Sequence, residues 1–181
     1  MRPAISVLLT FSCLLLFESA AAAGINSLRE QGFSLMPAPQ KVKLEPGLAV
    51  LGSGWCVEAS AGCGTIPLSS LIDGAEKLHG VVFAAAGDNK ILLTVSPGAV
   101  SDAPNSETSA QAYRIRITPE RVEITGNSQA GLFYGVQSLL QLMRRDPNGH
   151  LILPRGEIID WPDLQLRVMH WDTKHHQNRM E

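Results

Sequence analysis

The chain has 181 residues, a formal net charge of −2 at pH 7 and 45% hydrophobic residues. This length allows one domain of ordinary size together with a short additional segment. The near-neutral balance lacks the basic surface of a nucleic-acid-binding protein, so we expect no nucleic-acid partner. The sequence also lacks a run of like charges that would indicate a solvated tail.

The first residues are typical of a secretory signal peptide. Met1 and Arg2 form a short basic start, residues 5–17 form an apolar run, and residues 20–23 offer an Ala-x-Ala cleavage sequence. The apolar run is too short to span a bilayer comfortably, which disfavours the alternative of a retained anchor. We expect cleavage after Ala22 or Ala23, and a secreted or periplasmic protein without membrane contact after cleavage.

Beyond the signal, strands and loops alternate. Two prolines keep residues 35–40 extended, and short strands are predicted at residues 41–44 and 48–51, on either side of a Pro46-Gly47 turn. Residues 52–64 read as a glycine-rich loop. Helical spacing of apolar residues predicts a helix over residues 69–78, ended by His79-Gly80. A strand at residues 91–95 and a polar surface loop at residues 96–111 follow.

The loop at residues 52–64 contains Cys56 and Cys63, the cysteines that remain after the signal. An even pair in an exported protein favours a disulfide. Two free thiols are the alternative, because export does not require oxidation. A metal site is disfavoured, since no His lies near the pair.

The clearest pattern in the chain runs from Tyr113 to Met143. Residues 113–117 and 121–125 alternate strictly around a Pro119-Glu120 turn and predict an antiparallel hairpin that is half buried. The spacing then becomes helical, with Asn127 or Ser128 as the N-cap. Gly131 and Gly135 lie four residues apart in this helix, which indicates a face that presses closely on the sheet.

After this helix, Asp146-Pro147-Asn148-Gly149 predicts a turn, and short strands are predicted at residues 151–153 and 157–159. A hairpin feeding a helix that folds back on the sheet indicates an α+β fold. A boundary lies near residues 160–163, and Leu164, Leu166 and Val168 then begin a new alternating strand. A strand and the start of a helix cannot bury a core alone, so we expect the chain to be part of a longer protein.

The segment after this boundary is rich in side chains that could take part in catalysis or ligand binding. Readings as a metal site and as a nucleophile–base pair are weak, because no ligand spacing matches a helix-borne pair and no Ser or Cys is present. Two interpretations remain open. The segment is either a solvated end of the chain or the mouth of a β/α-barrel, at the C-terminal end of its first strand. The residues concerned are Arg167, His170, Asp172, Lys174, His175, His176 and Glu181.

Three stretches resemble family-20 glycoside hydrolases, the β-N-acetylhexosaminidases. They are Met-Pro-Ala-Pro-Gln at residues 36–40, Gly-Leu-Phe-Tyr-Gly-Val-Gln-Ser-Leu-Leu-Gln at residues 131–141, and Ile-Asp-Trp-Pro-Asp at residues 159–163 leading to Arg167 and Asp172. The resemblance covers roughly residues 35–172. It implies a signal peptide at residues 1–23, an accessory domain at residues 33–160 with an antiparallel sheet covered by helices on one face, and the first strand of a catalytic barrel at residues 161–181.

The resemblance also implies a function. Members of this family remove terminal non-reducing N-acetylhexosamine residues from glycans, with retention and with the substrate's own acetamido group as the nucleophile. The assisting Asp-Glu pair lies on a later barrel strand, so this chain alone is expected to be inactive and to need no cofactor or metal. By resemblance Arg167 binds sugar hydroxyls, and Asp172 and His176 belong to the same sugar site. His175 and Val168 depart from the family pattern.

Two alternatives come from other classes. The chain could be a stand-alone carbohydrate-binding or interaction module, although Trp55, Trp161 and Trp171 do not form a spaced stacking platform. It could also be part of a related glucuronidase. The sequence following Glu181 discriminates all three. A stop codon favours the module, a barrel with an Asp-Glu pair favours the hexosaminidase, and the same downstream sequence would identify a glucuronidase.

Overall fold

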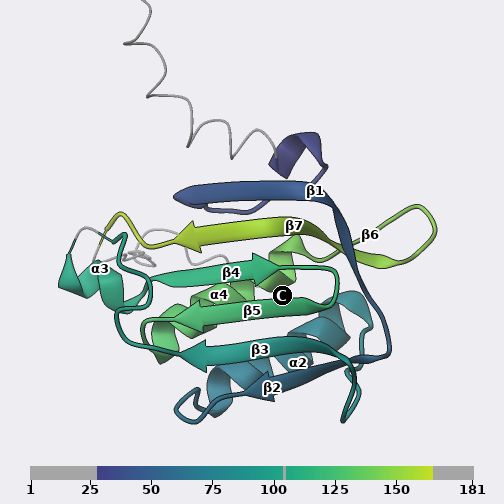
Figure 1. Cartoon of the computed structure of the whole chain (residues 1–181), viewed down its shortest axis with the longest axis horizontal. Helices are drawn as coiled ribbons and strands as arrows, with labels where there is room; N and C mark the ends of the chain where they lie inside the picture. Colours follow the sequence, from purple (N-terminus) through teal and green to yellow (C-terminus); the bar gives the residue numbers. More distant parts are fainter. Residues whose placement is uncertain (1–27, 104, 165–181) are drawn as a thin grey trace, which may run out of the picture.

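The computed structural model describes residues 28–103 and 105–164. Within these ranges a seven-stranded sheet is covered on one side by the two long helices (Figure 1). The predicted α+β class is therefore confirmed. Among the described residues, no helix is both long enough and apolar enough to cross a bilayer.

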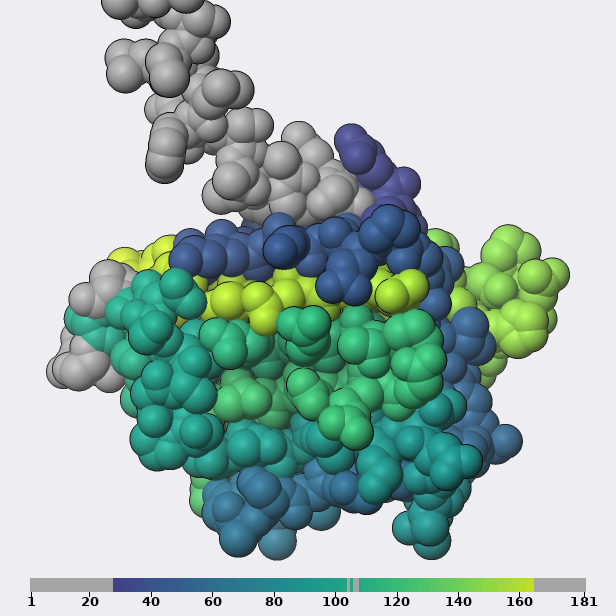
Figure 2. Space-filling view, in the orientation of Figure 1, coloured from purple at the N-terminus to yellow at the C-terminus, as the bar shows by residue number. Residues whose placement is uncertain are grey.

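The strands lie in the order β1-β7-β4-β5-β3-β2, and β6 pairs with β7. Figure 2 shows their outer face, with β1 at the top and β2 at the bottom. The strands are β1 (Lys41–Leu51), β2 (Trp55–Ala59), β3 (Asn89–Val95), β4 (Tyr113–Ile117), β5 (Arg121–Gly126), β6 (Arg144–Arg145) and β7 (Leu151–Asp160). The helices are α2 (Thr65–His79), α3 (Ser106–Ala110) and α4 (Gln129–Leu142).

The predicted hairpin is present, with β4 antiparallel to β5 and Ile115 opposite Ile124. The sheet as a whole is mixed rather than purely antiparallel, because β2 pairs parallel with β3 and β3 pairs parallel with β5. Helix α2 connects β2 to β3, and a helical crossover of this kind returns the chain in the same direction.

Helix α4 forms where its capping group and apolar stripe predict it. The Ser128 side chain accepts hydrogen bonds from the backbone amides of Ala130 and Gly131, which confirms one of the two predicted N-caps. Leu132, Val136 and Leu139 are fully buried against the sheet and α2. Together with the inward side chains of β3, β4 and β5 they form the core.

The two glycines of α4 are required by its close approach to the sheet, as the sequence predicts. A Cβ at Gly131 would overlap the backbone carbonyl oxygen of Ala112. A Cβ at Gly135 would lie 2.6 Å from Cγ2 of Ile124. Real Cβ atoms do not approach so closely, and therefore only glycine allows the helix this position.

The opposite face of the sheet is charged. Register places Arg116 between Glu123 and Glu157, and Lys43 beyond Glu157. Arg114 lies 3.6 Å from Glu157, and both side chains are about a third exposed. This alternation of core and charged positions confirms the pattern that predicted the hairpin.

Several elements differ from the sequence-based expectation. Strand β1 is continuous, with a register shift between Leu44 and Leu48 where a turn was predicted, and β7 is one strand rather than two. Strand β2 lies in the predicted loop.

The helices also differ from the expectation. Helix α2 begins at Thr65 instead of Ser69, because Pro67 is tolerated in a first helical turn. Helix α3 lies in the predicted surface loop, and Asn105 caps it by accepting from the amide of Thr108.

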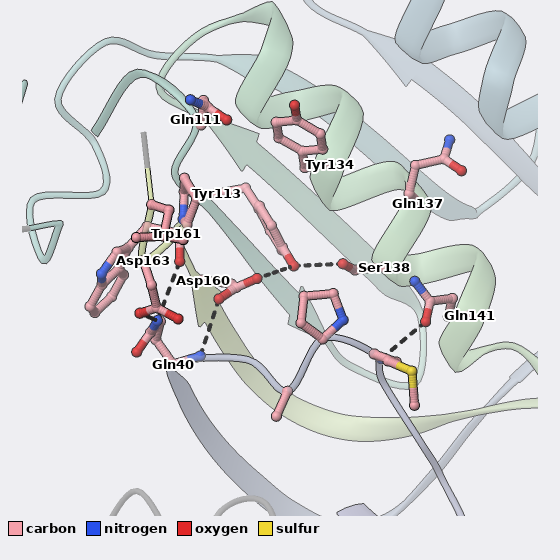
Figure 3. A pocket seen from close by; sticks show the side chains of 15 residues that line it. Gln40, Gln111, Tyr113, Tyr134, Gln137, Ser138, Gln141, Asp160, Trp161 and Asp163 are labelled. Carbon is pink, nitrogen blue, oxygen red and sulfur yellow. Dashed lines mark hydrogen bonds between the residues drawn. The ribbon is translucent and has the colours of Figure 1, made fainter. Parts of the chain in front are cut away.

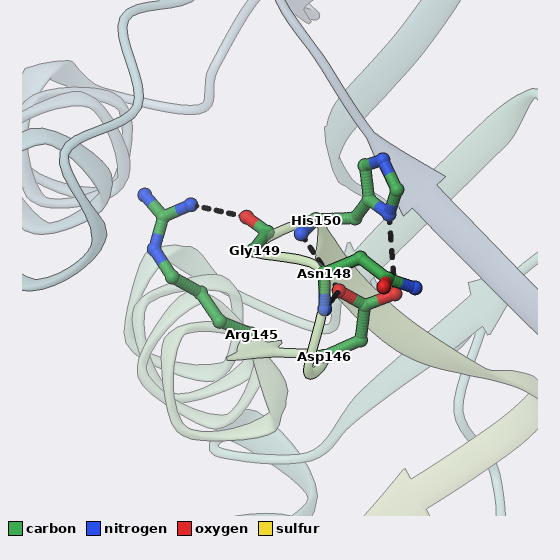
Figure 4. A network of polar contacts seen from close by, with 5 residues as sticks. All are labelled: Arg145, Asp146, Asn148, Gly149 and His150. Carbon is green, nitrogen blue, oxygen red and sulfur yellow. Dashed lines mark hydrogen bonds and ion pairs between the residues drawn. The ribbon is translucent and has the colours of Figure 1, made fainter.

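The predicted turn between β6 and β7 is confirmed and is held by one carboxylate (Figure 4). Asp146 Oδ1 accepts from the backbone amides of Asn148 at 2.9 Å and His150 at 2.8 Å, and Oδ2 lies 3.1 Å from His150 Nδ1. Arg145 donates to the Gly149 carbonyl oxygen at 2.6 Å. The turn is therefore ordered by its own side chains.

Candidate functional site

A pocket of about 280 Å³ lies where the last strand of the sheet ends (Figure 3). We call it the exit pocket, because the chain leaves the sheet along its rim. Four stretches far apart in sequence build it: residues 36–40 before β1, which we call the leader, the start of β4, one face of α4 and the residues that follow β7. They contribute Met36, Pro37, Ala38, Gln40, Gln111, Tyr113, Tyr134, Gln137, Ser138, Gln141, Asp160, Trp161, Pro162, Asp163 and Leu164.

One stripe of α4 supplies the polar wall of the exit pocket. Tyr134, Gln137, Ser138 and Gln141 follow one another at helical spacing, so they share one side of the helix. The apolar side of the same helix packs on the sheet. The helix thus separates the core from the exit pocket.

A buried hydrogen-bonded group forms the floor of the exit pocket. The Tyr113 hydroxyl lies 2.5 Å from the Ser138 hydroxyl and donates to Asp160 Oδ2 at 2.9 Å. Burial, with the Asp160 charge, raises the pKa of Tyr113 far above its usual value. Tyr113 therefore stays protonated and acts as a donor to the carboxylate.

Burial also raises the pKa of Asp160. Hydrogen bonds from the Tyr113 hydroxyl and the Gln40 backbone amide favour the ionised form and offset part of that rise. The carboxyl is thus partly desolvated and accepts bonds from two segments of the chain. It joins the start of β4 and the leader to the end of β7.

Gln40 fastens the leader to the chain that leaves β7. Its backbone amide donates to Asp160 Oδ1 at 3.2 Å, and its side-chain amide donates to Asp163 Oδ1 at 2.5 Å and to the Trp161 carbonyl oxygen at 3.4 Å. On the other rim, the Met36 amide donates to Gln141 Oε1 at 3.1 Å. Lys41 Nζ lies 5.6 Å from the centre of the Trp161 ring. These contacts fix the direction in which the chain leaves the domain.

The exit pocket offers hydrogen-bonding groups beside apolar surface. Within the described residues no group of three or more His, Cys, Asp or Glu side chains could hold a metal ion. The lining presents amides, hydroxyls and two carboxylates beside apolar side chains. Such a lining can hydrogen-bond a peptide or a sugar.

The predicted sugar-site residues Arg167, Asp172 and His176 lie outside the described residues, so their roles remain predictions. The residues of the exit pocket were not predicted as a site. The polar positions in α4 were a signal for them, since Gln137, Ser138 and Gln141 interrupt an otherwise apolar helix. Asp160 belongs to the Ile-Asp-Trp-Pro-Asp stretch at residues 159–163, a pattern that does not by itself indicate a partly buried carboxyl.

The predicted disulfide is not formed, and Cys56 and Cys63 are both free and buried. Cys63 belongs to the core and its thiol donates to the Leu93 carbonyl oxygen at 2.9 Å. Cys56 follows Trp55 in β2, and strand alternation turns it away from the core that Trp55 enters. Its thiol instead faces the carbonyl oxygens of Gly87 and Asn89, at 3.5 and 3.7 Å.

A mixed sheet covered by helices on one face, with a pocket at the end of its last strand, defines an α+β domain. The model of glycosyl hydrolase family 20, domain 2, matches residues 32–161. The chain belongs to glycosyl hydrolase family 20.

Solved structures with this fold include several enzymes. The chitobiase of Flavobacterium johnsoniae is 19% identical, with a TM-score of 0.58, and the match covers 74% of this chain and 21% of that one. A family-20 β-N-acetylglucosaminidase is 27% identical, with a TM-score of 0.53, over 70% of this chain and 22% of its own.

The β-N-acetylhexosaminidase of Streptomyces coelicolor A3(2) is 23% identical, with a TM-score of 0.51, over 70% of this chain and 26% of its own. This chain thus spans about a fifth to a quarter of the length of the structures that it matches.

Proposed function

We propose that the chain is the N-terminal part of an exported β-N-acetylhexosaminidase. The family match over residues 32–161 carries this proposal, and the names of the similar structures support it. In this proposal residues 1–23 are a signal peptide, residues 33–160 are the accessory domain, and residues 161–181 begin a β/α-barrel. The substrates are glycans that end in N-acetylhexosamine.

The proposed reaction is hydrolysis with retention, assisted by the substrate. The acetamido oxygen of the sugar attacks the anomeric carbon while a Glu protonates the leaving oxygen, and water then opens the cyclic intermediate. An Asp orients the acetamido group. By family resemblance both carboxylates belong to a later barrel strand, so the residues of this chain contribute binding only.

In the same proposal the three predicted site residues form part of the sugar pocket. The Arg167 guanidinium offers a planar fork of donors that suits neighbouring sugar hydroxyls. Asp172 and His176 lie nearby, at the C-terminal end of the first barrel strand, where sites of this barrel type are built. No cofactor takes part.

The reaction is tested with the protein translated from the reading frame continued past Glu181. We expect this longer protein to release the aryl alcohol from an aryl N-acetyl-β-glucosaminide and to leave an aryl glucuronide intact. NMR of the first product should show the β-anomer. Cleavage of the glucuronide instead, or an α-anomeric first product, would contradict the proposal.

Export is tested separately. When the gene is expressed in a bacterium with a working secretion system, we expect the mature protein outside the cytoplasm. Its mass should correspond to a start at Ala23 or Gly24. An uncleaved chain that remains in the cytoplasm would rule out the signal peptide.

A further inference from the structure

The exit pocket has the size of a binding site for one small molecule. Its volume of about 280 Å³ lies at the lower end of the range for such sites, about 300–1,000 Å³. Its lining is mainly apolar with a few polar groups, which is the usual composition of a ligand site. The exit pocket therefore suits a compact ligand, such as a single sugar unit, better than a long chain.

The charges around the exit pocket disfavour an anionic ligand. Its described lining includes the carboxyl groups of Asp160 and Asp163 and contains no Lys, Arg or His side chain. Two carboxylates repel an anion that enters between them, with no cation to offset the repulsion. Phosphates and acidic sugars are thus poor candidates, and neutral ligands are favoured.

The carboxyl groups also favour a ligand that carries hydroxyl donors. An ionised carboxyl can accept about four hydrogen bonds. Asp160 receives bonds from the Tyr113 hydroxyl and from the backbone amides of Gln40 and Trp161. One acceptor position of Asp160 is left, and a sugar hydroxyl is a donor that can fill it.

The wall formed by α4 adds an amide group. The Gln137 side chain forms no hydrogen bond with any other described residue, whereas Gln141 already accepts from the Met36 amide (Figure 3). A side-chain amide carries both a donor and an acceptor, and an acetamido group carries the complementary pair. The apolar side chains of Met36 and Pro37 line the same pocket and can take up the acetamido methyl group.

We propose that the exit pocket binds one N-acetylhexosamine unit of a glycan, with Gln137 paired to the acetamido group and Asp160 accepting from a sugar hydroxyl. The size, charge and amide group of the pocket carry this inference. The choice of an N-acetylhexosamine also rests on the function proposed above, because glycans of this kind are its substrates. The accessory domain would then add its own affinity for the glycan to that of the whole protein.

NMR titration of the isotope-labelled 181-residue chain with N-acetylglucosamine tests the proposal. We expect the side-chain amide signals of Gln137 and the indole N–H signal of Trp161 to shift together and to saturate with one Kd. The Trp55 indole is the internal control, because it is buried at the opposite end of the sheet and donates to the Val50 carbonyl oxygen. No saturable shift at Gln137 and Trp161, or an equal shift at Trp55, would overturn the proposal.

The acetamido contact is tested by comparing two sugars in the same experiment. Glucose carries a hydroxyl in place of the acetamido group and should bind about fivefold more weakly, the effect of one hydrogen bond between neutral groups. Gln137→Ala should weaken the binding of N-acetylglucosamine by about the same factor and leave that of glucose nearly unchanged. Glu76→Ala, on the exposed side of α2, is the control and should change neither. Equal losses for both sugars in Gln137→Ala would contradict the assigned contact.

A short peptide is the competing ligand, because it also carries amide groups. N-acetylalanine methylamide has two amides and no hydroxyl, so we expect it to bind more weakly than N-acetylglucosamine. Tighter binding of the peptide would make the exit pocket a peptide site and would refute the inference. None of these titrations requires hydrolysis. A chain that binds the sugar beside an inactive longer protein would refute the proposed function alone, and an active longer protein beside a chain that does not bind would refute this inference alone.

Discussion

The two sides of α4 are built on different principles. The side facing the sheet has Gly131, Leu132, Gly135 and Val136, and it fits by shape, with the backbones of helix and sheet nearly touching. The side facing the exit pocket has Tyr134, Gln137, Ser138 and Gln141, of which Ser138 and Gln141 hydrogen-bond to Tyr113 and Met36. The first side is buried in the core, whereas the second side is mostly polar, although Tyr134 also packs against the core.

This difference indicates that the sheet-facing side of α4 contributes most to folding, while the other side contacts the residues that follow β7. A close-packed contact tolerates no added atom, whereas a polar wall tolerates substitution as long as its buried partners stay paired. Substitutions on the two sides should therefore change the free energy of unfolding by different amounts and with different pH dependence.

The largest effect is expected from Gly131→Ala. Alanine favours a helix over glycine by about 1 kcal/mol, but its Cβ would overlap the Ala112 carbonyl oxygen, so we expect a net loss of about 3 kcal/mol. The free energy of urea unfolding measures this change. Gly74→Ala in α2 is the matched control, because its added Cβ meets only the movable tip of Leu140. If the Gly131→Ala chain were as stable as the control, close packing would not determine the stability of the sheet-facing side of α4.

Tyr113→Phe should have the next largest effect. It removes the hydroxyl that joins Ser138 to Asp160 and leaves the partly buried carboxyl with one partner fewer, at a cost of about 1–3 kcal/mol. Ser138→Ala removes only one of these bonds and should cost less in the same unfolding experiment. If Ser138→Ala cost as much as Tyr113→Phe, the bond to Asp160 would contribute nothing.

Asp160 makes the stability of the exit pocket depend on pH. Burial raises its pKa in the folded protein above 3.8, so its neutral form favours folding. That contribution is fully present below pH 3.8 and is lost as the pH rises through the raised value. Asp160→Asn stays neutral, and we expect its stability relative to wild type to increase from acid to neutral pH.

The measurement is urea unfolding of both proteins across that range, with Asp88→Asn, an exposed carboxyl directly before β3, as the control. A difference between Asp160→Asn and wild type that stays constant with pH would exclude this role of Asp160.

The smallest effect is expected far from both sides of α4, at the turn between β6 and β7. Desolvation acts to raise the pKa of Asp146, but the hydrogen bonds from His150 and Asn148 outweigh it and hold the pKa below its usual value. This group therefore stabilises the fold above pH 3.8 and ceases to do so as the pH falls through the lowered value.

Asp146→Ala should lower the Tm by about 2 °C at neutral pH and by less in acid. Asn148→Ala is the control, because only its backbone amide contacts Asp146. A deficit for Asp146→Ala that grows in acid would contradict the assignment.

The sequence predicts the sheet-facing side of α4 far better than the exit pocket. Strict alternation in residues 113–125 and helical spacing after Ser128 are local signals, and both elements form as expected. Strand β2 was missed because glycines precede it and its partner β3 lies some thirty residues further along the chain, beyond α2. Such pairing leaves no local pattern.

The exit pocket could not be predicted in the same way, because its residues come from four separate segments. Gln40 and Asp160 are 120 residues apart, and only the neighbouring positions of β1 and β7 in the sheet bring them together. The disulfide prediction was wrong for a related reason: spacing along the chain says nothing about the side of β2 to which Cys56 points.

The most direct test of the account is a comparison of hydrolysis of an aryl N-acetyl-β-glucosaminide by two purified proteins. One is the 181-residue chain, and the other is the protein translated from the continued reading frame. The account predicts release of the aryl alcohol by the longer protein and no release above the uncatalysed rate by the chain. Turnover by the chain alone, or an inactive longer protein, would contradict it.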